Sequence, residues 1–152
     1  MKIIATNKKA FHDYEVLDTI EAGVVLSGDE VKSLRLGHAQ LKGSFAHIRK
    51  GEMQLVNAHI SLYAKAYDKG RSEEYTTRSR KLLLHRRELD RLIGDIARKG
   101  VSIVPLKLYF NKRGKVKVEL GICKGKKKAD KRQALKERDI KRQTDREMRD
   151  RS

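Results

Sequence analysis

Alternating apolar and polar residues indicate that most of the chain before residue 124 forms β-strands. The Gly51–Glu52 pair separates two such stretches, which is the spacing of a β-hairpin. The strand candidates in this part of the chain are 12–18, 20–26, 45–50, 53–57 and 58–63. They are short and closely spaced, which favours an antiparallel sheet.

Two further strands are expected near the end of this region. Residues 101–110 are long and apolar, and Pro105 within them marks an edge or a bulge. A turn at 111–114 follows. Residues 115–120 then alternate strictly, so we expect their valines and leucine to face inward and their charged residues outward.

Two segments read as helices. The first, 27–36, has Ser27 as its candidate N-cap, with acidic residues in the first turn and basic residues later. The second, 87–99, has apolar residues at helical spacing and Gly100 as a stop signal. The predicted fold class is therefore mainly β with a few helices: a small antiparallel barrel, of which the OB-type barrel is a nucleic-acid-binding example.

Composition changes near residue 123. Residues 124–152 hold 13 Lys plus Arg and 6 Asp plus Glu, a net charge of +7, with too few apolar side chains to bury a helix face. We expect a folded body over 1–123 and a basic tail over 124–152 that is disordered in the free protein. Charge pairs at helical spacing bias residues 129–150 toward a helix that forms on binding. The alternative is a nonspecific basic tether.

The charge of the chain points to a polyanionic partner. The net charge is +17, and charged residues make up 38% of the sequence. The sequence shows no apolar run long enough to cross a membrane and no secretory leader, and Cys123 is its one cysteine. We therefore expect a cytoplasmic protein in a reducing compartment, a monomer without a membrane partner, with Cys123 an unreactive strand residue.

Signals for an enzyme are weak. No two of the five histidines stand at the spacing of a helical metal pair, and no phosphate-binding loop or paired catalytic carboxylates are visible. We expect no catalytic residue, no metal and no cofactor. The basic residues instead form several clusters, and the few aromatic residues favour recognition of folded RNA by shape and backbone over extensive base stacking.

A set of short strings resembles the SmpB family, the SsrA-binding proteins of bacteria. None of these strings is decisive alone, but they follow the order of the family from about residue 5 to 132. They are NKKA at 7–10, HDYE at 12–15, EAG at 21–23, GDEVKSLR at 28–35, RSRKLLLH at 78–85, REL at 87–89, VPLKLY at 104–109, GICKGKK at 121–127 and DKR at 130–132.

The resemblance implies an OB-like barrel that binds the tRNA-like part of tmRNA and helps to rescue stalled ribosomes by trans-translation, without catalysis. By the pattern of the family, Glu21, Leu83 and Lys117 match positions linked to tmRNA binding. The further RNA-binding candidates are Asn7, Lys8, Lys9, His12, Tyr14, Lys32, Arg35, Arg80, Lys81, Lys107, Lys124, Lys126 and Lys127. The residues expected to start the ribosome-acting tail are Lys128, Asp130, Lys131 and Arg132.

Two positions depart from this pattern. Phe11 stands where many relatives have a basic residue, and Glu119 stands beside Lys117 where a second lysine is frequent. Both departures reduce the positive charge of the surface. Two other readings of the chain stay open at this point, a basic structural protein of the ribosome and an enzyme acting on RNA.

Two of the candidates have alternative explanations. Glu21 is an acid in a basic protein, so it is expected to accept a hydrogen bond from a base or to orient a lysine or arginine, or else to be an ordinary surface acid. The adjacent leucines 82–84 cannot all face one core. Leu83 is the expected exposed one, the alternative being that loop packing buries all three.

Overall fold

The computed structural model of the chain describes residues 1–63 and 73–125. The tail predictions, including the helix over 129–150, lie outside these residues. The described helices are α1 (Lys8–Asp13), α2 (Gly28–Arg35) and α3 (Arg86–Lys99), with a 3-10 turn η1 (Glu73–Thr77). The described strands are β1 (Lys2–Thr6), β2 (Tyr14–Val24), β3 (Ala39–Gln40), β4 (Phe45–Arg49), β5 (Glu52–Val56), β6 (His59–Ile60), β7 (Arg80–Leu83), β8 (Ser102–Phe110) and β9 (Val116–Gly125).

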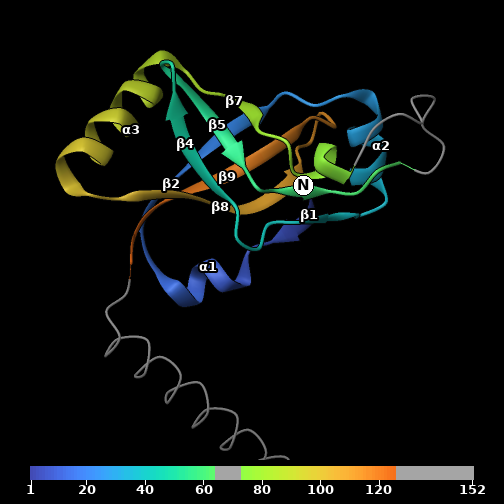
Figure 1. Cartoon of the computed structure of the whole chain (residues 1–152), viewed down its shortest axis with the longest axis horizontal. Coiled ribbons are helices and arrows are strands. Elements are labelled where there is room, and N and C mark those ends of the chain that lie inside the picture. The colour runs from blue at the N-terminus through green and yellow to red at the C-terminus, as the bar shows by residue number, and fades with distance from the viewer. Residues whose placement is uncertain (64–72, 126–152) are drawn as a thin grey trace, which may run out of the picture.

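Six of these strands close into a ring. The large sheet has the order β1-β8-β4-β5-β7-β2-β9, and β8 also pairs with β9, so the sheet closes on itself while β1 adds to β8 from outside. Closure removes the exposed edges that an open sheet would present. Helices α2 and α3 lie at opposite ends of the barrel, and α1 lies along one side (Figure 1). The predicted mainly β, OB-like fold is confirmed.

The barrel interior is filled by the inward-facing residues of these strands. Leu108, Val118 and Leu120 are fully or almost fully buried in this core, together with Leu92 of α3. The alternation predicted for 115–120 is confirmed, because Val118 and Leu120 are buried whereas Lys117 and Glu119 are not. Pro105 adjoins a shift in the register of β8 with β9, so it marks a bulge, as expected.

Both predicted helices are present within a residue of their expected bounds. Ser27 caps α2 in a reciprocal pair with Glu30: the Glu30 backbone N–H donates to Ser27 Oγ, and the Ser27 N–H donates to the Glu30 carboxylate. Helix α3 ends at Gly100, whose φ of 61° is the left-handed conformation that glycine adopts without strain.

Three expectations about the local structure are wrong. The strand predicted from residue 12 begins at Tyr14, because Asn7 caps the short helix α1 immediately before it. The break expected near residue 19 is absent, and β2 runs without interruption from Tyr14 to Val24, with only a register shift against β9. The strand predicted over 58–63 is reduced to the two residues of β6.

Candidate nucleic-acid interface

Strands β2, β7, β8 and β9 place the main sequence candidates on one face of the barrel. In the strand register, Glu21 lies opposite Glu119, which in turn lies opposite Lys107. Gly23 lies opposite both Leu83 and Lys117. Directly opposed residues of a sheet project to the same side. We call the surface formed by Glu21, Leu83, Lys107, Lys117 and Glu119 the binding face.

A pocket of about 400 Å³ opens at one end of this face. It is lined by Glu21, Gly23, Leu83 and Lys117, and by residues at the start of α3. A Cβ atom at Gly23 would lie 3.3 Å from Leu83 Cβ and 3.7 Å from Lys117 Nζ. Gly23 therefore leaves the space that brings an apolar side chain and a cation together beside Glu21.

Tyr109 fixes the position of the Glu21 carboxylate. The Tyr109 hydroxyl donates a hydrogen bond to Glu21 Oε2. Burial, together with this bond, raises the pKa of Tyr109 well above its usual value, so the phenol stays protonated and keeps donating. Because Tyr109 holds Oε2 of Glu21, the carboxylate is oriented as a hydrogen-bond acceptor in the lining of the pocket.

The three adjacent leucines differ in solvent exposure, as expected. Leu82 is 3% exposed and belongs to the barrel core, whereas Leu83 is 51% exposed and Leu84 is half-buried. Successive residues of β7 point to opposite faces. The expectation that at least one leucine is exposed is confirmed, and the exposed one lines the pocket of the binding face.

Replacing these leucines one at a time separates binding from stability. We expect Leu83→Ala to lower RNA affinity by roughly 5- to 30-fold, because about 1–2 kcal/mol of apolar burial on RNA is lost. Its melting temperature should barely change, since exposed positions contribute little to folding.

Leu82→Ala is the matched control. We expect it to destabilise the fold by about 2–5 kcal/mol, because it leaves a cavity in the core. RNA titration and thermal unfolding of both variants give the comparison. A large stability loss in Leu83→Ala with RNA affinity retained would assign Leu83 to the core instead.

Arg80 is a structural residue, and the prediction that it contacts RNA is wrong. Its side chain is 0% exposed. Its Nε donates to Glu30 Oε2 at 2.6 Å, and its two terminal nitrogens donate to the carbonyl oxygens of Ala58 and Thr76 at 2.7 and 2.9 Å. Arg80 thus joins β7 to the start of α2, to the loop before β6 and to η1, with no surface left for a phosphate.

Glu30 is the acceptor at the centre of this network. Burial alone would raise its pKa, but hydrogen bonds from the Ser27 backbone and from Arg78 and Arg80 hold the pKa below its usual 4.5. Glu30 is therefore ionised at neutral pH. A buried carboxylate with several charge-assisted hydrogen bonds fixes the relative position of the elements that carry them.

Asn7 is also structural. Its side chain is 4% exposed, accepts from the Ala10 N–H at the start of α1, and donates from Nδ2 to the Pro105 carbonyl at 2.9 Å. These bonds anchor α1 against β8. The direct RNA contact predicted for Asn7 is not compatible with this burial, so we assign Asn7 to positioning the residues that follow it.

The remaining candidates do not gather at one place. Lys8 and Lys9 are exposed on α1, and Lys32 and Arg35 are exposed on α2. His12 and Tyr14 are half-buried at the end of α1 and the start of β2, and Lys124 is exposed near the end of β9. Lys81 is exposed on β7 and lies 3.2 Å from Glu52. The candidates outside the described residues are Lys126, Lys127, Lys128, Asp130, Lys131 and Arg132.

The binding face includes two contributors that the sequence analysis missed. Tyr109 was counted only as part of an apolar strand, although its alternation with Lys107 places both on one side of β8. Gly23 was not singled out, although a glycine inside a strand is a signal of close approach by another group. Glu119 lies beside Lys117 on the outer side of β9, as expected.

The described residues contain no constellation typical of an enzyme. Within residues 1–63 and 73–125, no group of three or more His, Cys, Asp or Glu side chains could hold a metal ion. Cys123 is fully buried, and burial raises the pKa of its thiol to about 11, so it is not an activated nucleophile. None of the helices in the same residues has the length and apolar character needed to span a bilayer.

A small, strongly basic antiparallel barrel with a charged and apolar outer face is typical of RNA-binding barrel proteins. The particular family follows from comparison with known proteins. The family model described as SmpB protein matches residues 4–150. The chain belongs to the SmpB family.

Close relatives cover nearly the whole chain. The SsrA-binding protein of Syntrophotalea carbinolica is 53% identical over 151 residues, covering 99% of this chain and 98% of the relative. That of Coprothermobacter proteolyticus is 49% identical over 147 residues, covering 97% of each. A solved structure described as "tmRNA-SmpB: a journey to the center of the bacterial ribosome" contains a chain with 47% identity and a TM-score of 0.66, covering 86% of this chain and 92% of that one.

Proposed function

We propose that this protein is a non-catalytic adaptor that binds the tRNA-like part of tmRNA and delivers it to stalled ribosomes for trans-translation. The observation that carries the proposal is the convergence of Glu21, Leu83 and Lys117, from three different strands, on one pocket. Membership of the SmpB family indicates which RNA is bound, since relatives are SsrA-binding proteins and a similar chain comes from a tmRNA–SmpB structure.

Each part of the binding face has a chemical role in this proposal. Lys107 and Lys117 supply cations for backbone phosphates, which carry most of the affinity in RNA binding. Leu83 supplies an apolar surface for an unstacked base. Glu21, held by Tyr109, accepts from the amino group of a base, a contact that a phosphate could not make with an acid.

The proposal needs no reaction at the protein itself. Binding free energy and geometry are sufficient for an adaptor, and the protein would act as a monomer in the cytoplasm, where ribosomes work. The tail candidates Lys128, Asp130, Lys131 and Arg132 would act toward the ribosome, because the chain leaves the barrel at the end of β9. Lys124, Lys126 and Lys127 stay candidates for RNA binding.

Glu21→Ala tests the proposal against simple electrostatics. We expect the variant to bind the tRNA-like part of tmRNA roughly 10- to 100-fold more weakly, because hydrogen bonds to charged groups contribute about 1.5–3 kcal/mol. Its net charge rises by one unit, so charge attraction alone would strengthen binding. Gel-shift titration at fixed salt measures the difference.

Glu15→Ala is the matched control for this experiment. Glu15 is exposed on the same strand, outside the pocket, and its removal changes the net charge equally. We expect its affinity to stay equal to or slightly above that of the unmodified protein. If Glu21→Ala binds tmRNA as tightly as Glu15→Ala does, the carboxylate has no role in recognition.

A further inference from the structure

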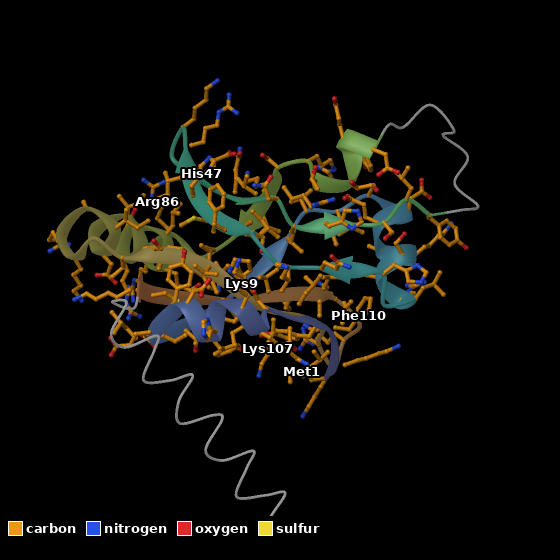
Figure 2. All side chains as sticks on the ribbon, turned by 60° about the horizontal axis from the view of Figure 1, so that its bottom comes forward. Met1, Lys9, His47, Arg86, Lys107 and Phe110 are labelled. Carbon is orange, nitrogen blue, oxygen red and sulfur yellow. The ribbon has the colours of Figure 1, made fainter. Side chains whose placement is uncertain are left out.

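Glu119 lies at the centre of the binding face, yet none of the functions assigned above uses it. In the strand register it lies directly opposite Glu21 of β2 and directly opposite Lys107 of β8. Directly opposed residues project to the same side of a sheet, so these three side chains form a row across the face. Figure 2 labels Lys107, which lies opposite Thr6 of β1 and forms the cationic end of the row.

The two carboxylates of this row are neighbours, although like charges directly opposite each other are destabilising. Tyr109 offsets part of this cost, because its hydroxyl donates a hydrogen bond to Oε2 of Glu21. Burial, this hydrogen bond and the negative charges of Glu21 and Glu119 raise the pKa of the phenol. Glu119 therefore lies close enough to act on the proton that Tyr109 donates. Local arrangements that cost stability are typical of functional sites.

Tyr109 also keeps the opposite charges of the face apart. It lies opposite Lys117 on β9, and its hydroxyl reaches Glu21 on β2, the strand beyond β9. Its side chain therefore crosses β9 between the positions of Lys117 and Glu119. Lys117 Nζ lies toward β2, 3.7 Å from the place of a Cβ atom on Gly23. Within residues 1–63 and 73–125, Glu119 forms no ion pair, so its negative charge is available to an RNA.

This arrangement of charges lets the binding face distinguish between RNAs. Lys107 and Lys117 attract phosphates, whereas the two carboxylates repel a phosphate and accept hydrogen bonds from base amino groups or 2′-hydroxyls. Like charge against a wrong partner raises specificity more than affinity. We propose that Glu119 determines specificity: with Glu21, it excludes phosphates from the centre of the binding face and so disfavours RNAs that present no hydrogen-bond donors there. This inference rests on the proposed function.

The test measures the preference of the full chain for tmRNA over another RNA. The RNAs are the tRNA-like part of tmRNA and an unrelated structured RNA of the same length. The chain is used unmodified and with Glu119→Gln, Glu119→Lys, Glu15→Gln or Glu15→Lys. Glu15 is the matched control, an exposed acid on β2 that lies directly opposite Lys124 of β9 and outside the binding face. Gel-shift titrations over a range of salt give each affinity, and thermal unfolding checks that each variant is folded.

We expect Glu119→Lys to bind the unrelated RNA roughly 3- to 10-fold more tightly than Glu15→Lys does, because a cation then stands where a phosphate was excluded. The slope of log K against log salt for this RNA should become steeper by about 0.7–0.9, the effect of one added phosphate contact. Affinity for tmRNA should not exceed that of Glu15→Lys, so the preference for tmRNA falls by at least the same factor. If Glu119→Lys does not fold, Glu119→Gln, which keeps the size of the side chain, carries the test with a smaller loss of preference.

Two results would overturn the inference alone. If both Glu119 variants keep the preference that the Glu15 variants show, Glu119 is an ordinary surface charge. If Glu119→Lys tightens the binding of tmRNA by the same factor as that of the unrelated RNA, the centre of the face takes a phosphate from either RNA. In both cases the unmodified chain still prefers tmRNA, and the proposed function stands. An unmodified chain without any preference would contradict the proposed function, and the inference with it.

Discussion

Truncation of the chain after Gly125 is expected to abolish peptide tagging on stalled ribosomes and to leave tmRNA binding nearly intact. The residues of the binding face all lie before this point, and the pairing of Gly125 with Tyr14 is retained, so the barrel loses no strand. The residues removed carry 12 Lys plus Arg against 6 Asp plus Glu. A chain with that charge is suited to a path lined by ribosomal RNA.

The sequence predicts a specific action for this segment, beyond its charge. Glu137 and Lys141, Asp145 and Arg149, and Glu147 and Arg151 stand four residues apart, each pair favouring a helix by roughly 0.2–0.5 kcal/mol. This is too little to form a stable helix in water, but enough to bias the chain once phosphates surround it. A helix over residues 129–150 would extend roughly 33 Å, a length suited to the empty messenger path.

Tagging assays with stalled ribosomes measure this effect directly. The control is a full-length chain in which residues 126–152 are shuffled, keeping composition and charge but disrupting Asp130, Lys131, Arg132 and the helical spacing. We expect both the truncated and the shuffled chain to bind tmRNA and fail to tag. Tagging by the shuffled chain would indicate a nonspecific tether, and tagging by the truncated chain would show that the tail is dispensable.

Arg80→Met is expected to cost about 3–5 kcal/mol of the free energy of unfolding. The substitution keeps an apolar stem but leaves the buried Glu30 carboxylate with one arginine fewer, and breaking a buried ion pair typically has this cost. It also leaves the carbonyl oxygens of Ala58 and Thr76 without the donor they have now. Urea unfolding at pH 7 measures the loss.

Lys81→Ala is the control on the neighbouring residue. Lys81 and Glu52 form an exposed pair at 3.2 Å, and such pairs contribute about 0–1 kcal/mol. We therefore expect a small change. If Arg80→Met is as stable as Lys81→Ala, the buried network does not hold the elements together.

The same network predicts a dependence of stability on pH. The pKa of Glu30 is lower in the folded chain than its ordinary 4.5, so its stabilising effect is fully present above that value. The effect is lost as the pH falls below 4.5 through the depressed pKa of the folded state. Glu30→Gln should remove part of this acid sensitivity, and unfolding curves between pH 3 and pH 7 will show whether it does.

Periodicity was sufficient to predict much of the fold. The hairpin of β4 and β5, strand β9 and the helices α2 and α3 show patterns that come from burial on one face, and β8 shows the continuous apolar run of a strand buried on both faces. Helix α1 was missed because it is six residues long, too short for a period to be seen, and depends on the Asn7 cap and its bond to Pro105. A hydrogen bond between residues as distant in the sequence as Asn7 and Pro105 cannot be predicted from the residues around either one.

The binding site was only partly predictable for a similar reason. Glu21, Leu83 and Lys117 came from the resemblance to the SmpB family, and the strand register then explained why they act together. Arg80 and Lys81 are adjacent basic residues with equal appearance in the sequence, yet the pleat of β7 buries one and exposes the other. Whether Arg80 or Lys81 faces the core depends on how β7 pairs with strands that are distant in the sequence. The pattern of charges along the chain carries no information about this pairing.

This protein is expected to select tmRNA among cellular RNAs, and sequencing the RNA bound to the intact chain in bacterial cells tests this most directly. We predict that tmRNA is the most enriched RNA relative to its abundance, and that Leu83→Ala loses this enrichment. A basic structural protein of the ribosome would instead recover the ribosomal RNAs in equal amounts. Such a profile, with tmRNA no more abundant than in the input, would contradict the account.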